Sequence, residues 1–196
     1  MADSLNRRQS VRITDRLLLT SKPVSQEKYE AVVKDFANGI SLYNQEGLAD
    51  IQMVIGAQGA LAKLSEKDEP LADFLRHLDN KLNMILKMVK AEKTSYDDLE
   101  MMKANLSGNG IAFISTEAVA VDALLELHLV LLPSYAYVYS LGKVVTCESL
   151  PEGAEEQGYR IAVEFTVLME EDREKLIQHC FKQQSLALRN RRLNNS

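Results

Sequence analysis

Hydrophobic and polar positions repeat along this chain with two different periods, which divide it into a helical middle and two β-rich flanks. An apolar run from Val11 to Leu19 ends near Pro23 and predicts a first strand, because proline cannot donate to the ladder of a sheet. From Ser25 the apolar residues recur at spacings of three and four, which is typical of amphipathic helices. We therefore predict helices at about 25–43, 48–64 and 70–89.

The third predicted helix has the most regular pattern of the three. Its apolar residues are spaced alternately by four and three positions: Leu71, Leu75, Leu78, Leu82, Ile85 and Val89. This spacing is typical of a coiled-coil seam. Phe74, Leu86 and Met88 flank the seam, so the apolar face is wider than a contact between two helices requires. We expect several helices to meet there, in a homo-oligomer (dimer or tetramer) assembled through residues 24–95.

After residue 99 the pattern changes to a period of two. The predicted strands are Ile111–Ser115, Leu124–Leu132, Tyr137–Cys147 and Tyr159–Phe165. One apolar face on each strand suits a small antiparallel barrel, which the first strand would join across the helical segment. A last helix is predicted from Glu170, with acids at its start and arginines near its end that complement the helix dipole.

Composition restricts the classes of function. The chain has 196 residues, of which 46% are hydrophobic, so it can bury a core. Its net charge of −5 and its lack of tryptophan disfavour binding to duplex or single-stranded nucleic acid. Basic residues gather instead between Ser4 and Lys22, which suits a small anionic ligand. The sequence predicts neither a membrane span nor a signal peptide, and hence a soluble cytoplasmic protein.

The sequence predicts no catalytic centre and no metal site or cofactor. Cys147 and Cys180 lie in apolar patterns and are expected to be buried, reduced thiols. His77, His128 and His179 are far apart and lack a metal-ligand spacing, so we expect them at the surface or on the side of a helix. The carboxylates are expected on a solvated surface.

Two polar motifs lie on either side of the predicted helical segment. Arg8 and Arg12 form R-x-x-x-R, and Arg7 precedes them directly. The segment Asn105–Gly110 contains N-x-S-x-x-G, formed by Asn105, Ser107 and Gly110. We interpret this segment as a turn whose glycines and asparagines tolerate positive φ, so that the backbone can approach a ligand closely. Taken alone, it is most simply the turn of a hairpin.

In this order, and followed by a β-rich segment, the two motifs resemble those of the PilZ domain family of cyclic di-GMP receptors. The run from Tyr159 to Thr166 and the run from Glu171 to Ile177 also resemble the last strand and the closing helix of that family. The resemblance covers about 5–22 and 100–192. It implies an α+β fold, in which 1–22 and 96–192 form an antiparallel β-barrel with a C-terminal helix and 23–95 is an inserted helical segment.

The resemblance also implies a function, that of a non-enzymatic receptor that signals to a downstream protein. Its ligand, cyclic di-GMP, would be bound by Arg7, Arg8, Arg12, Asn105, Ser107 and Gly110. An arginine can grip a phosphate in bidentate fashion, donate to guanine O6 and N7, or stack on a purine. Asn105 and Ser107 would hydrogen-bond a guanine or its neighbouring backbone, and Gly110 would allow close approach.

One departure from the family pattern is at Asn105, and a second function stays open beside the receptor. Many family members have aspartate where this chain has Asn105; the amide keeps an acceptor, adds a donor and loses the charge. The alternative is a structural or adaptor protein that assembles through its helices without binding nucleotide. The intact motif residues favour the receptor.

Overall fold

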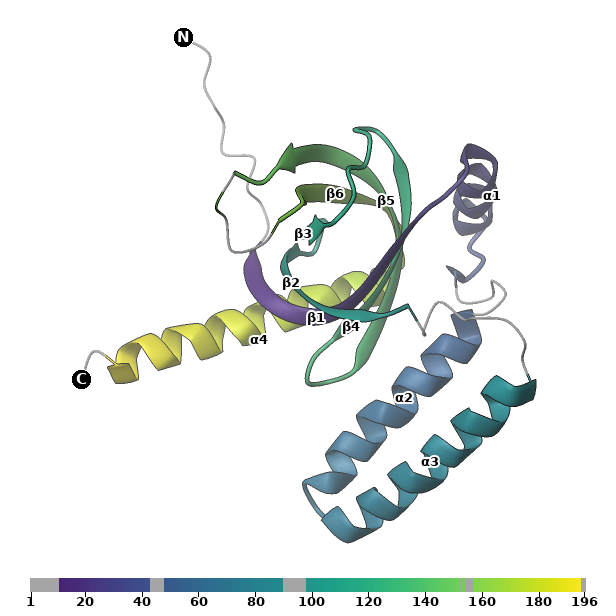
Figure 1. Cartoon of the computed structure of the whole chain (residues 1–196), viewed down its shortest axis with the longest axis vertical. Coiled ribbons are helices and arrows are strands. Elements are labelled where there is room, and N and C mark those ends of the chain that lie inside the picture. Colours follow the sequence, from purple (N-terminus) through teal and green to yellow (C-terminus); the bar gives the residue numbers. More distant parts are fainter. Residues whose placement is uncertain (1–10, 43–47, 90–97, 152, 154–156, 195–196) are drawn as a thin grey trace.

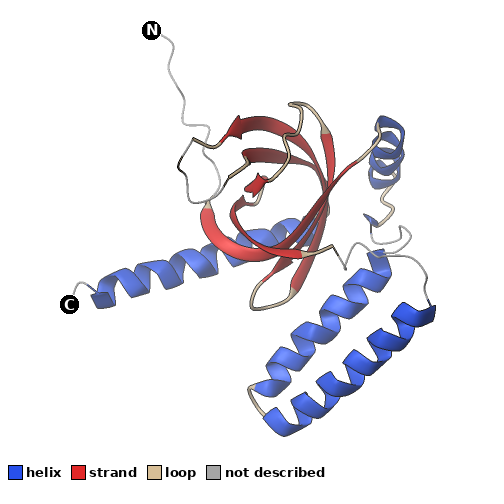
Figure 2. Ribbon diagram, viewed as in Figure 1, coloured by secondary structure: helices blue, strands red, loops and turns tan. Residues whose placement is uncertain are grey.

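The structure is a computed structural model and describes residues 11–42, 48–89, 98–151, 153 and 157–194. Its elements in chain order are β1 (Ile13–Pro23), α1 (Gln26–Ala37), α2 (Leu48–Ser65), α3 (Glu69–Val89), β2 (Glu100–Ser107), β3 (Gly110–Ser115), β4 (Leu124–Leu131), β5 (Ala136–Ser149), β6 (Tyr159–Leu168) and α4 (Glu170–Asn194). Figure 2 shows strands gathered in one body with helices around it, which confirms the predicted α+β fold.

The strands form a closed antiparallel barrel in the order β1-β2-β3-β6-β5-β4. Strand β1 closes it, since Leu17 lies opposite Met102 of β2 on one side and opposite Leu131 of β4 on the other. The first strand therefore pairs with the later ones across the inserted helices, as the apolar pattern had predicted.

The barrel interior is filled by every second residue of the strands. On β4, for example, Leu125, Leu127, Leu129 and Leu131 are each at most 2% exposed. Helix α4 adds Leu176 and Cys180 to the same core. Beyond these residues α4 continues past the barrel and projects away from it (Figure 1). One half of this helix therefore packs on the barrel, and the other half extends outward.

Of the inserted helices, α1 and α2 pack on the outside of the barrel, over β4 and β5. A second core joins Tyr137 and Tyr139 of β5 to Val32 of α1 and Ile55 of α2. Helices α2 and α3 run side by side as a hairpin that projects from the barrel, with α3 on the outer side (Figure 1). Among the described helices, none is both long enough and apolar enough to cross a membrane.

The predicted seam on α3 lies on the surface of this single chain. Six of its apolar side chains are between 37% and 60% exposed: Leu71, Phe74, Leu75, Leu78, Leu82 and Ile85. The side chains of Leu86, Met88 and Val89, which also belong to the predicted stripe, lie outside the described part of the structure. Helix α2 packs on α3 through a different face, to which the fully buried Ala72 belongs.

The first helix is shorter than predicted. It ends at Ala37, whereas the apolar spacing had predicted helix as far as residue 43. The reason is Gly39, whose φ of +75° takes the chain out of the helix. The amide of Ile40 then donates back to the Asp35 carbonyl at 3.0 Å, which satisfies one of the last helical acceptors.

Candidate functional site

The segment predicted as a turn is mostly strand. Asn105 and Ser107 belong to β2 and Gly110 begins β3, so the turn itself consists of Gly108 and Asn109. None of the three residues 108–110 has a positive φ, so the turn does not use the conformational freedom that its glycines and asparagine allow. Asn, Ser and Gly are poor strand formers, and β2, which precedes the first strand predicted after the helices, was not among the predicted strands.

Strand pairing brings the polar motif residues onto one outward face. Asn105 lies opposite Ala112 of β3, which in turn lies opposite Ala162 of β6. In the next row, Ser107 lies opposite Gly110, and Gly110 opposite Glu164. Residues that alternate with these, such as Leu106 and Val163, are at most 2% exposed and point into the barrel.

This outward face is hollowed, because the middle of each row has almost no side chain. The hollow has a volume of about 360 Å³. Residues from β2, β3, β5, β6 and the approach to β1 line it: Arg12, Asn105, Ser107, Asn109, Gly110, Ile111, Ala112, Val145, Ala162, Val163 and Glu164. Alanine and glycine form the floor, and both polar side chains and the exposed apolar side chain of Val145 surround it. A flat, polar molecule can therefore lie against the sheet.

The structure brings together four of the six predicted site residues. Arg12, Asn105, Ser107 and Gly110 all line the hollow. The side-chain amide of Asn105 donates to Thr14 Oγ1 at 3.3 Å, which ties β2 to the strand that follows Arg12. Arg7 and Arg8 lie outside the described residues.

Ser107 and Gly110 also have structural tasks of their own. The Ser107 hydroxyl is buried, donates to the Gly110 carbonyl at 3.3 Å and accepts from the Asn109 amide at 3.3 Å. A Cβ atom on Gly110 would lie 2.5 Å from the carbonyl oxygen of Val163 on β6. Glycine is thus required because β6 approaches closely, a requirement that no sequence motif reveals.

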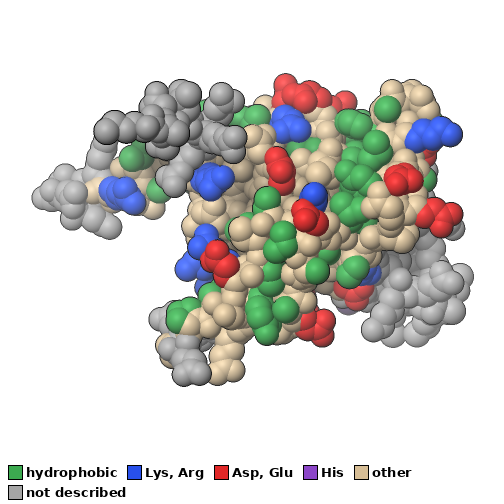
Figure 3. Space-filling model, turned by 90° about the horizontal axis from the view of Figure 1, so that it is seen from above, with side chains coloured by type: hydrophobic (Ala, Val, Ile, Leu, Met, Phe, Trp, Pro, Cys, Tyr) green, Lys and Arg blue, Asp and Glu red, His purple; other side chains and the backbone are tan. Residues whose placement is uncertain are grey.

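The charge of the hollow is mixed. Among its described lining residues, Arg12 is the basic side chain and Glu164 the acidic one. Figure 3 shows basic and acidic side chains interspersed on the visible face of the molecule, where the described atoms form no continuous basic field. Glu164 was not predicted as a site residue, although the alternation along Tyr159–Phe165 had already placed it on the polar face of its strand.

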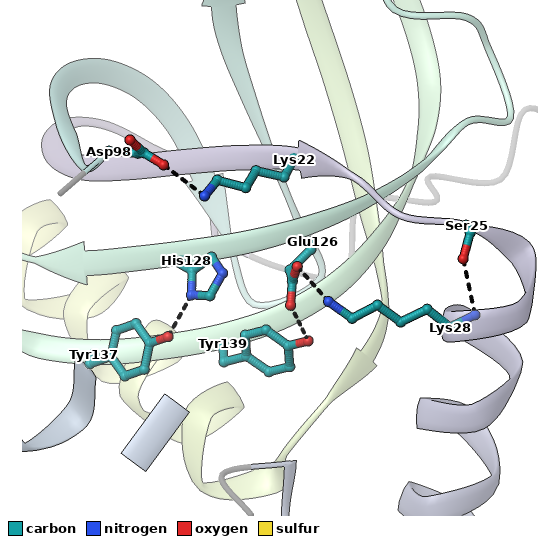
Figure 4. Close-up of polar contacts among 8 residues, drawn as sticks. All are labelled: Lys22, Ser25, Lys28, Asp98, Glu126, His128, Tyr137 and Tyr139. Atoms are coloured by element: carbon teal, nitrogen blue, oxygen red, sulfur yellow. Dashed lines mark hydrogen bonds and ion pairs between the residues drawn. The ribbon is translucent and has the colours of Figure 1, made fainter. Parts of the chain in front are cut away.

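A second polar cluster lies where α1 meets the barrel (Figure 4). His128 Nδ1 and the Tyr137 hydroxyl are 2.6 Å apart, while Glu126 accepts from Tyr139 at 2.8 Å and from Lys28 at 2.9 Å. His128 is 1% exposed, so the expectation of a surface histidine was wrong for this residue. The inserted helices cover the outer face of β4, which the local sequence cannot show.

Burial and hydrogen bonding change the acidity of these groups. Burial lowers the pKa of His128 to about 4, and its Nε2 has no hydrogen-bond partner among the described residues. Burial raises the pKa of Glu126, but hydrogen bonds from Lys28 and Tyr139 outweigh it and the net pKa is lowered. His128 is therefore neutral and Glu126 ionised near pH 7. The described residues contain no group of side chains that could hold a metal ion.

Four further side chains test the expectations from sequence. His179 lies on the side of α4, 2.8 Å from Asp15 of β1. Asp172 is fully buried and accepts from Lys175 at 2.6 Å, so the expectation of solvated carboxylates was wrong here. Cys147 and Cys180 are free thiols; only Cys180 is fully buried, and burial raises its pKa to about 11.

Comparison with known proteins addresses the family of this chain. The fold is similar to that of a tetrameric PilZ domain from Xanthomonas campestris, self-assembled through a helical bundle. That similarity has a TM-score of 0.50 and 14% identity, over 92% of this chain and 91% of the other. An inhibitor of motility from Bacillus subtilis is also similar, with a TM-score of 0.46 and 13% identity over 92% of this chain and 52% of the other.

None of the curated proteins compared with the chain matches it. A family model, the PilZ domain, matches residues 85–182, which is half of the 196-residue chain. The match includes Asn105, Ser107 and Gly110 and all of β2 to β6, while Arg12 and β1 precede it. The chain therefore belongs to the PilZ domain family, as its two motifs had suggested.

Proposed function

We propose that this protein is a receptor for cyclic di-GMP, which binds in the hollow over β2, β3 and β6. The observation that carries the proposal is that Arg12 and Asn105, far apart in the sequence, line the same hollow. Membership of a family whose members are typically cyclic di-GMP receptors supports it. Arg7 and Arg8, just before Arg12 in the sequence, would complete the set of basic residues.

The residues of the hollow suit the groups of this ligand. Arginine provides planar donors for a phosphate or for guanine O6 and N7. The floor of Ala112, Ala162 and Gly110 lets a purine ring approach the backbone of the sheet. Asn105 offers both a donor and an acceptor. The Glu164 carboxylate can accept from the N1–H and N2–H₂ donors of guanine, which adenine lacks at these positions.

Binding would act by bringing two distant segments together. The arginines before β1 would close over a ligand that rests on β2, β3 and β6, and this closure would change the surface that a downstream protein recognises. No bond in the ligand needs to be broken for this, so the protein acts as a receptor and not as an enzyme.

Calorimetric titration tests the proposal. Cyclic di-GMP should release heat with the wild-type protein, whereas cyclic di-AMP and GTP should bind much more weakly. Arg8→Ala/Arg12→Ala should lose at least about tenfold in affinity, because each lost charge-assisted hydrogen bond is worth about 1.5–3 kcal/mol. Arg16→Ala is the matched control, since Arg16 is exposed on β1 but does not line the hollow. Absence of heat from the wild type would refute the receptor function.

We also propose that the receptor is a homo-oligomer, a dimer or a tetramer, assembled through its inserted helices. The apolar stripe on α3 supports this, because it is exposed in the single chain. The Xanthomonas campestris PilZ domain with a similar fold self-assembles through a helical bundle. Assembly in this form is compatible with ligand binding, since the stripe and the hollow lie on different elements.

A further inference from the structure

Helix α4 holds the turn between β2 and β3 through an arginine in its first turn. Arg173 Nη1 donates to the Gly108 carbonyl oxygen at 3.0 Å and to Asn109 Oδ1 at 2.9 Å. Asn109 lines the hollow together with Asn105 and Ser107. One guanidinium thus joins the C-terminal helix to the turn that contributes to the candidate site.

Packing along α4 reinforces this link. A Cβ atom on Gly108 would lie 2.9 Å from Ile177 Cγ1, so the helix and the turn are in close contact. Further along the helix, Cys180 Sγ is 3.7 Å from the Leu106 carbonyl oxygen of β2. From the other side, the Phe165 amide of β6 donates to the Asn109 carbonyl at 2.9 Å. The turn is therefore held between α4 and β6.

The position of Arg173 is not explained by the stability of its own helix. The start of a helix carries partial positive charge, and the acids Glu170, Glu171 and Asp172 at the start of α4 complement it. Arg173 opposes it. Glu170 Oε2 is 3.6 Å from Arg173 Nε but its side chain is 81% exposed, so this pair offsets little. The strongest described contacts of Arg173 are those with the turn.

We propose that Arg173 is a positioning residue for the ligand site and that it makes α4 the element that responds to ligand. By holding Gly108 and Asn109, it fixes the end of β2, where Asn105 and Ser107 present their polar atoms. This inference rests on the proposed receptor function. Because coupling between two sites is reciprocal, a contact that strengthens ligand binding is itself strengthened by the ligand.

The outward part of α4 would carry this coupling away from the barrel. Beyond the barrel contact the helix exposes Phe181, Leu186 and Leu188, which are 54%, 41% and 51% exposed. A helix transmits a shift at its start to its far end, because its backbone is hydrogen-bonded throughout. Occupancy of the hollow would therefore alter how this exposed segment is held.

Calorimetry with cyclic di-GMP tests the positioning role. Arg173→Ala should weaken binding by about tenfold, the effect of losing a hydrogen bond to a charged group, and Arg173→Lys should restore part of it. Leu176→Ala is the control for stability: it removes a buried side chain of the same helix and should lower Tm, but leave Kd within about twofold. An unchanged Kd for Arg173→Ala would overturn the proposal.

Hydrogen exchange separates this proposal from the receptor function. Without nucleotide, peptides covering 105–112 should exchange faster in Arg173→Ala than in the wild type, since the turn is released. With cyclic di-GMP, residues 170–181 should exchange more slowly in the wild type but not in the variant. Unchanged exchange at 105–112 would overturn the role of Arg173 whether or not nucleotide binds. A wild type that binds no nucleotide would overturn the receptor function and leave the 105–112 result valid.

Discussion

Residues of the hollow serve the barrel as well as the ligand, and Gly110 shows this most clearly. It occupies ordinary extended backbone, yet the Val163 carbonyl oxygen would lie 2.5 Å from an added Cβ. Backbone atoms cannot move aside as the end of a flexible side chain can. The glycine of the N-x-S-x-x-G motif is therefore required by the packing of β3 on β6, before any ligand is considered.

We expect Gly110→Ala to destabilise the protein in the absence of nucleotide. Overpacking of this kind costs about 1–3 kcal/mol, and each kcal/mol lowers Tm by about 2–4 °C in a chain of this size. Gly56→Ala is the control, because nothing lies within 4 Å of the added Cβ and the helix favours alanine by about 1 kcal/mol. Calorimetric unfolding of both variants measures the difference. An unchanged Tm for Gly110→Ala would show that the motif glycine serves the ligand alone.

At this scale the sequence predicted which residues meet but not why each is needed. Asn105 and Ser107 are two positions apart, so on a strand they share a face, and the motif already paired them with Arg12 as residues of one site. The hydrogen bonds of Ser107 within the turn and the demand on Gly110 depend on β3 and β6. No spacing within 105–110 contains that information. The same applies to Arg173, whose partner turn precedes it by many residues.

At the scale of elements, the interface between α1 and the barrel is the most sensitive to pH. His128 is buried there beside Tyr137, Tyr139 and Glu126, with Lys28 reaching over from α1 (Figure 4). Lys22 of β1 also lowers the pKa of His128, while Glu126 raises it. Burial outweighs the effect of the carboxylate, so the imidazole is neutral in the folded protein.

We predict that stability falls as the pH is lowered from 6.5 toward 4. The folded pKa of His128 is about 4, against about 6.5 when unfolded, so the unfolded chain binds more protons in this window. The loss between pH 6.5 and 5 should be about 1.5 kcal/mol, and about 3 kcal/mol over the whole window. His128→Asn cannot titrate and should flatten this slope, even if its stability is lower at every pH.

Urea unfolding at pH 6.5, 6.0, 5.5 and 5.0 measures this slope. Only the upper part of the window is used, because the pKa of Glu126 is lowered from its ordinary value of 4.5 in the folded protein. The stability that the Glu126 carboxylate contributes is therefore lost mainly below pH 4.5, outside the range measured. Equal slopes for wild type and His128→Asn would show that His128 is not responsible for acid sensitivity.

The regular spacing of apolar residues allowed the helices and strands to be predicted. Backbone conformation at single residues and contacts between distant segments limited those predictions. The four-and-three pattern of the third helix placed it at 70–89, and the structure has it at Glu69–Val89. The first helix ended early, because Gly39 takes a conformation that apolar spacing does not report. His128 alternates with leucines as a solvent-facing residue would. A segment from elsewhere in the chain covers it, so its burial was not predictable locally.

At the scale of the whole molecule, the sequence suggested both the barrel and the insertion within it. The closure of the barrel by β1 followed from the first apolar run and from the family motifs, and the structure confirms it. The position of α2 and α3 relative to the barrel did not follow, because helical periodicity defines a face but not its partner. In the structure, α2 contacts the barrel and α3 lies outside it.

The exposed stripe on α3 yields the prediction that belongs to the whole molecule. Six large apolar side chains are left partly exposed on one helix, each worth about 1 kcal/mol if the rest of its surface is buried. Light scattering at micromolar concentration should give two or four times the chain mass of 22.0 kDa. Leu78→Glu should reduce this to the mass of one chain, because a carboxylate in an apolar seam has no partner to offset its desolvation.

Asn80→Glu adds the same charge two residues away on the opposite side of the helix and should leave the oligomer intact. A wild type with the mass of one chain would contradict assembly through the stripe, and loss of the oligomer in both variants would point to net charge rather than to the seam.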